Sequence, residues 1–138
     1  MPKIALGDFV KKTTGVGRLL VAVYGIFAIS ASARALYQLA REFDQAPVAY
    51  SLSALAAIVY IVATISLANP ERYGSLALIA VRFELLGVLV VGLLSWSAPE
   101  LFNHPSVWSG FGIGYGFVPL VLPILGLIWL RRQRVKAN

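Results

Sequence analysis

The stretch VAYSLSALAAIVYIVATISLA, residues 48–68, contains 21 residues and no charged side chain. Crossing the roughly 30 Å hydrocarbon core of a bilayer takes about 20 helical residues. A helix pairs its own backbone amides and carbonyls, which a membrane-spanning segment requires because lipid offers them no hydrogen-bond partner. Residues 48–68 are therefore predicted to form a transmembrane helix.

Three further stretches have similar length and apolar character, namely residues 19–40, 76–96 and 111–130. The chain of 138 residues is 59% hydrophobic and 13% charged, with a mean hydropathy of +0.78. Soluble domains carry about 25% charged residues, and a soluble core of this size cannot bury so much apolar surface. These values exclude a soluble enzyme, a disordered tail and a nucleic-acid-binding module. The sequence predicts one all-α domain, residues 1–138, with four transmembrane helices in an up-down bundle.

Lysine and arginine predict the orientation of these helices, because both concentrate in cytoplasmic segments. With four spans, nine of the twelve basic residues lie on the side of the two termini, and only Arg41 lies on the other side. The sequence therefore predicts a multi-pass protein of the plasma membrane with both termini in the cytoplasm. The nine are Lys3, Lys11, Lys12, Arg18, Arg72, Arg131, Arg132, Arg134 and Lys136.

The segments between and before the spans carry further signals. The basic and apolar segment 4–12 is predicted to rest on anionic headgroups. Residues 31–33, Ala-Ser-Ala, imitate a signal-peptide cleavage site, so removal of the first span is an alternative. An N-P pair and a glycine in residues 69–74 predict a loop. Capping-box spacing in residues 97–100 predicts a short helix on the outer surface.

Three charged residues lie within the predicted spans, where each costs several kcal/mol unless it is paired or hydrated. Glu84 lies about 13 Å from the cytoplasmic border by helix rise, close to the bilayer midplane. Arg82 is two residues away, about 200° around the helix. Glu84 shares its face with small residues and is predicted to point into the bundle. Arg82 shares its face with leucines and is predicted to point toward lipid, where its side chain can extend to the cytoplasmic surface, or toward another protein.

Arg34 belongs to a polar stripe on the first span, and a strip of small residues lies on the opposite face. Two faces poorly suited to lipid predict that another subunit covers one of them. The Arg34 side chain leans toward the start of its helix, so an Arg34–Glu84 pair is geometrically feasible. Two interpretations stay open: a structural ion pair that fixes helix register, or a carboxylate or anion site in a transport path.

Glycine alternates with larger residues at the start of the fourth span. On a helix these glycines form two overlapping GxxxG pairs, which favour close packing, and two prolines farther along are predicted to kink the helix. Two interpretations of this segment stay open: its shape fits neighbouring helices, or it acts as a hinge or lines a cavity. The residues are Gly110, Gly112, Gly114, Gly116, Pro119 and Pro123.

The run GFVPLVLPILGL at residues 116–127, with WLRR at 129–132, is similar to the end of small four-span integral membrane proteins found in actinobacteria. The resemblance covers the fourth span closely and the rest of the chain in layout. It implies a plasma-membrane address and no particular activity.

The chain contains no cysteine and a single histidine, His104, which is interpreted as a solvated loop residue. Disulfides, thiolate sites and multi-histidine metal sites are thereby excluded, and no catalytic set is evident. No metal, cofactor, nucleic-acid partner or enzymatic activity is predicted. The leading hypothesis is an accessory, assembly or stabilising subunit of a larger plasma-membrane complex, bound to another integral membrane protein or to itself. The alternative is a small oligomeric transporter or channel that uses Glu84 with Arg34.

Overall fold

The computed structural model describes residues 15–42, 44, 47–102, 106 and 108–137. Within these ranges the chain is helical with short connections and no strand, which confirms the all-α prediction. The helices are α2 (Gly15–Arg41), α3 (Pro47–Ala68), α4 (Pro70–Ser97) and α5 (Val118–Ala137), with two 3₁₀ segments, η2 (Pro99–Phe102) and η3 (Ser109–Tyr115), between α4 and α5.

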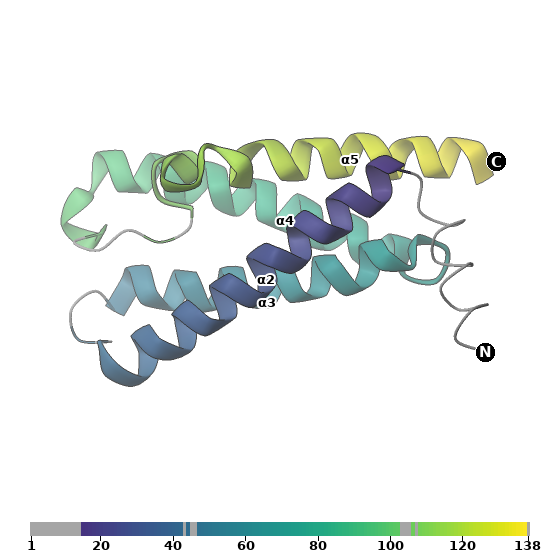
Figure 1. Ribbon diagram of the computed structural model, residues 1–138. Coiled ribbons are helices and arrows are strands. Elements are labelled where there is room, and N and C mark those ends of the chain that lie inside the picture. The colour runs from purple at the N-terminus through teal and green to yellow at the C-terminus, as the bar shows by residue number, and fades with distance from the viewer. Residues whose placement is uncertain (1–14, 43, 45–46, 103–105, 107, 138) are drawn as a thin grey trace.

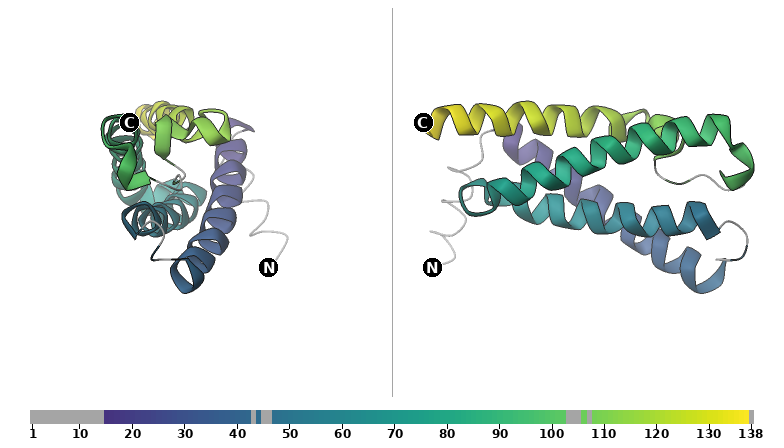
Figure 2. Two further views of the ribbon diagram at one scale, coloured as in Figure 1. Left: turned by 90° about the vertical axis from the view of Figure 1, so that its left-hand side faces the viewer. Right: turned by 180° about the vertical axis from the view of Figure 1, so that it is seen from behind.

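The four long helices surround one core, with α2 crossing its neighbours diagonally (Figures 1 and 2). The start of α2, the α3–α4 connection and the end of α5 lie at one end of the bundle, which we call the terminal end. The α2–α3 connection, η2 and η3 lie at the other end, which we call the η3 end. Three helices, α2, α3 and α4, are long and apolar enough to cross a membrane, and η3 with α5 makes a fourth span if the bent pair is counted as one.

The first three predicted spans coincide with α2, α3 and α4, but the predicted loop at 69–74 is wrong. Only Asn69 separates α3 from α4, and α4 begins at Pro70. Proline suits the first turn of a helix because the amide that it lacks has no partner within the helix there. The irregularity expected of a loop survives at Tyr73, whose φ of −116° and ψ of 23° interrupt the first turns of α4.

The prediction of an unbroken fourth helix over 111–130 is also wrong. The axes of η3 and α5 differ by 99°. Gly110, Gly112 and Gly116 have φ of 59°, 83° and 63°, the left-handed region that glycine enters readily, so the GxxxG pairs do not lie on an α-helix. Pro119 lies in the first turn of α5, where it starts a helix rather than kinking one, while Pro123 lies inside α5.

The remaining sequence predictions concern the imitation cleavage site, the segment after α4, the basic N-terminal segment and His104. Residues 31–33, the imitation cleavage site, lie in the middle of α2. The short helix predicted after α4 is present as η2, but Ser97 does not cap it: its hydroxyl donates to the carbonyl of Leu93 at 2.9 Å and so belongs to the end of α4. Segment 4–12 and His104 lie outside the described residues.

Glycines on α4 accommodate aromatic side chains from the segment that precedes α5. A Cβ atom added at Gly87 would lie 2.5 Å from the Trp108 ring, and one added at Gly92 would overlap the Phe111 ring. Trp108 is 1% exposed. The small residues of α4 therefore make room for aromatic rings from the segment that precedes α5.

Replacing Gly92 with alanine is expected to lower the free energy of unfolding by about 1–3 kcal/mol, since the added methyl group overpacks against Phe111. Gly74→Ala in the same helix is the control, because no atom lies within 4 Å of the added Cβ there. Thermal unfolding of the detergent-solubilised variants measures the difference. Equal melting temperatures for the two variants would contradict the packing of Phe111 on α4.

Candidate functional site

Glu84 lies in the core of the bundle, as predicted from the helical wheel. Its side chain is 0% exposed, and the Tyr24 hydroxyl on α2 donates a hydrogen bond of 2.5 Å to Glu84 Oε1. The structure gives Glu84 Oε2 no hydrogen-bond partner among the described residues. The Tyr24–Glu84 bond joins α2 to α4 and gives one of the two oxygens of the buried carboxyl group a hydrogen-bond partner.

An aromatic cluster extends from Tyr24 toward the η3 end, and consists of Tyr24, Phe27, Tyr60, Trp108 and Tyr115. Trp108 Nε1 donates to the Tyr60 hydroxyl at 3.0 Å, which satisfies both buried polar groups. Ring centroids lie 6.1 Å apart for Tyr24 and Tyr60, and 5.7 Å apart for Phe27 and Tyr115. Tilted aromatic pairs of this kind each contribute about 0.5–1.5 kcal/mol beyond area burial. The cluster therefore ties α2, α3 and η3 together.

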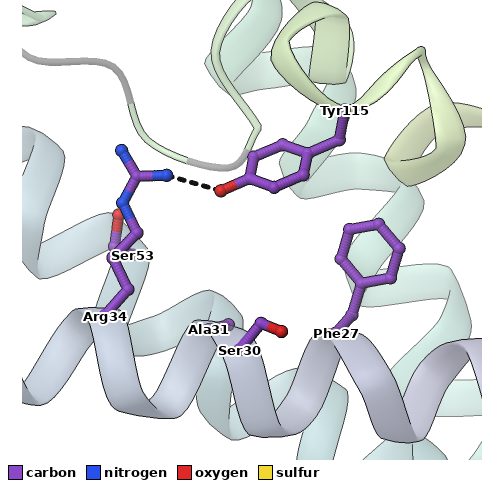
Figure 3. A pocket seen from close by; sticks show the side chains of 6 residues that line it. All are labelled: Phe27, Ser30, Ala31, Arg34, Ser53 and Tyr115. Atoms are coloured by element: carbon purple, nitrogen blue, oxygen red, sulfur yellow. Dashed lines mark hydrogen bonds between the residues drawn. The ribbon is translucent and has the colours of Figure 1, made fainter.

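Arg34 donates to the Tyr115 hydroxyl at 2.5 Å and remains exposed (Figure 3). The Arg34–Glu84 pair that the sequence left feasible is not formed directly: Arg34 binds Tyr115, and Glu84 binds Tyr24. Glu84 lies at the level of Tyr24, and Arg34 is ten residues farther along α2, about 15 Å by helix rise. The bend between η3 and α5 brings Tyr115 to Arg34, which an unbroken fourth helix did not suggest.

Two spaces adjoin the Arg34–Tyr115 pair. The smaller is a cavity of about 20 Å³, which is enough for one water molecule. Its lining side chains are Phe27, Ser30, Ala31, Arg34, Ser53 and Tyr115 (Figure 3). The larger is an open groove of about 580 Å³ at the η3 end. Because Arg34 and Tyr115 line both spaces, the hydrogen-bonded pair lies between the cavity and the groove.

The groove, which we call the η3 groove, gathers residues from α2, the end of α4 and the segment from 106 to η3. Its lining residues are Arg34, Ser95, Trp96, Ser106, Ser109, Gly110, Ile113, Gly114 and Tyr115. Two of the glycines predicted to pack helices, Gly110 and Gly114, thus line the groove. Gly112 instead lies against Pro119, where an added Cβ would come within 2.8 Å of the proline ring.

Arg82 is exposed on the outer face of α4, as predicted. The leucines on the same face, Leu86 and Leu93, are 59% and 60% exposed. The cation thus lies in the middle of an apolar outer surface.

The residues that sequence reasoning missed are the tyrosines and tryptophan that bind the charged groups and one another. A tyrosine in the middle of an apolar span is a usable signal, because a buried phenol hydroxyl requires a partner. Tyr24 and Tyr60 both occupy such positions. Tyr115 and Trp108 could not be found in this way, because their placement depends on the bend before α5.

Comparisons with known proteins add no assignment: no family model, curated protein or solved structure matches the chain. Among the described residues, no group of three or more histidine, aspartate or glutamate side chains could hold a metal ion.

Tyr24→Phe is expected to destabilise the protein by about 1–3 kcal/mol, because it leaves Glu84 without its donor in the core. Tyr37→Phe is the matched control, since Tyr37 lies on the same helix and is 60% exposed. Thermal unfolding in detergent compares the two. If Tyr24→Phe and Tyr37→Phe melt alike, the buried hydrogen bond contributes nothing to stability.

Proposed function

We propose that the protein is a non-enzymatic integral membrane protein that serves as an accessory, assembly or stabilising subunit of a larger plasma-membrane complex. The observation that carries the proposal is the exposed Arg82 among exposed leucines of α4. A cation within the apolar part of a membrane is costly and is usually paired or turned toward another polar group. A carboxylate or carbonyl group of a neighbouring membrane protein would satisfy Arg82.

The interior of the bundle supports the same proposal. Glu84 is bound to Tyr24, and it lines neither the small cavity nor the η3 groove. A carboxyl group enclosed in this way suits a role in holding α2 and α4 together. The surfaces that remain for function are the outside of the bundle and the η3 end.

We place both termini in the cytoplasm. The terminal end of the bundle carries Arg18, Arg72, Arg131 and Arg132, and an excess of basic residues is typical of the cytoplasmic side. Reporter domains fused to the two ends of the chain should both show cytoplasmic activity. Activity of the two reporters in opposite compartments would refute an even number of spans, and with it the fourth span formed by η3 and α5.

Purification of the tagged protein from native membranes in mild detergent should yield a stoichiometric complex with another integral membrane protein. Arg82→Leu is expected to reduce the amount of partner about tenfold, as loss of a desolvated charged contact does. Arg72→Leu is the control, because Arg72 is exposed on the same helix outside the predicted apolar span. Recovery of a pure homo-oligomer, or equal partner yields for the two variants, would contradict an accessory role through this face.

The alternative is a small oligomeric transporter or channel that uses Glu84. One observation favours it: Glu84 Oε2 is buried without a hydrogen-bond partner among the described residues. Flux in liposomes separates the two functions. Glu84→Gln should abolish flux under the transport alternative, whereas an accessory subunit shows none in the unaltered protein.

A further inference from the structure

We propose that the η3 groove binds the headgroup phosphate of an anionic phospholipid, with the Arg34 guanidinium as its cationic partner. The inference concerns this chain alone and does not depend on the accessory role proposed above. It rests on three features of the groove: an exposed arginine with donors to spare, a pair of buried hydroxyl groups and an apolar rim.

Arg34 is suited to phosphate. A guanidinium carries several N–H donors in a planar fork that matches two phosphate oxygens at once, and Tyr115 takes one donor of the Nη1 group. The Tyr115 bond also fixes the direction of the side chain, so less freedom is lost when a ligand binds. None of the residues that line the groove is acidic, so the charge of Arg34 is not cancelled within it.

Ser106 and Ser109 supply a second polar element. They are 6% and 9% exposed, and both line the groove. Their hydroxyl oxygens lie 3.0 Å apart, and Ser109 Oγ also accepts from the Ser106 amide at 2.9 Å. Two hydroxyl groups that share one hydrogen bond use one of their two hydrogens, which leaves the other for an anionic oxygen.

The rim favours a lipid over a soluble phosphate compound. Trp96 and Ile113 line the groove and are 67% and 61% exposed, so large apolar surfaces flank the polar floor. Tryptophan is typical of the membrane–water interface, where headgroups lie. A soluble phosphate would leave these surfaces uncovered, whereas the acyl chains of a lipid would cover them. Basic pockets between membrane helices are known to bind the headgroups of anionic lipids.

The backbone beside the groove adds a further observation. Phe111, next to the groove-lining Gly110, has a φ of 61°, a left-handed conformation that bulky residues rarely adopt. Backbone strain of this kind persists only where the surrounding structure holds it in place. It is found most often at active sites and ligand-binding sites. Here the Phe111 ring is held against α4 by Trp96, with ring centroids 4.9 Å apart.

The test uses the full-length protein in detergent and three probes: phosphatidylglycerol, phosphatidylcholine with the same acyl chains, and inorganic phosphate. Thermal stabilisation and native mass spectrometry report binding, since a ligand that binds the folded state raises its melting temperature. We expect phosphatidylglycerol to bind at least about tenfold more tightly than phosphatidylcholine, and inorganic phosphate to give no stabilisation. Arg34→Gln should abolish the preference between the lipids, whereas Arg41→Gln, an exposed arginine farther along α2, should keep it.

A second variant keeps the proposal testable if Arg34→Gln fails to fold. Ile113→Gln should weaken phosphatidylglycerol binding severalfold, while Ile124→Gln, at an exposed isoleucine of α5 outside the groove lining, should not. Equal binding of the two lipids by the unaltered protein would overturn the proposal, as would equal losses in Arg34→Gln and Arg41→Gln. Stabilisation by inorganic phosphate as large as that by phosphatidylglycerol would assign the groove to a soluble phosphate and overturn the lipid assignment.

Discussion

The hydrogen bond from Tyr24 to Glu84 is the constraint on which the arrangement of the helices depends. Along the chain, α2 packs mainly on α3 and α3 on α4, so this bond links α2 and α4 across the core. A carboxyl group in an apolar interior costs several kcal/mol unless it is hydrogen-bonded. The helices must therefore lie where a donor can reach Glu84. The backbone of α5 also lies close to this bond: a Cβ added at Gly126 would lie 3.6 Å from the Tyr24 hydroxyl, in ordinary van der Waals contact.

The Tyr24–Glu84 bond lies inside the bundle, apart from the surfaces that remain for binding. From Tyr24 the aromatic cluster fills the core toward the η3 end, where it stops at Tyr115 and the exposed Arg34. Within the cluster, the buried polar groups of Trp108 and Tyr60 bind each other, and the Tyr24 hydroxyl binds Glu84. Within the apolar part of the bundle, the exposed arginines are Arg34, which lines the η3 groove, and Arg82 on the outer face of α4.

Hydropathy and helical periodicity predicted much of this from the sequence. The first three spans, the inward Glu84 and the outward Arg82 follow from helix length and from the angle between neighbouring residues, both of which are local properties. The break before α5 does not follow from them, because alternating glycines fit a close-packed helix and a left-handed turn equally well. The partner of Arg34 could not be predicted either, since Tyr115 reaches it only after that break. Sequence reasoning named Glu84 as a feasible partner instead, because the Arg34 side chain leans toward the start of its helix, which is the side where Glu84 lies.

The break before α5 costs conformational free energy, and it provides Arg34 with a hydrogen-bond partner. Phe111 and Phe117 adopt positive φ at about 1–3 kcal/mol each, whereas Gly110, Gly112 and Gly116 do so without that penalty. Glycine occupies three of the five left-handed positions, which limits the strain of the break to the two phenylalanines. A straight helix through the same residues would avoid the strain but would remove η3, and with it the hydroxyl group that Arg34 binds and the polar floor beside it. The glycines that predicted close helix packing thus serve a different purpose, which is to let the chain turn across the bundle and bring the Tyr115 hydroxyl to Arg34.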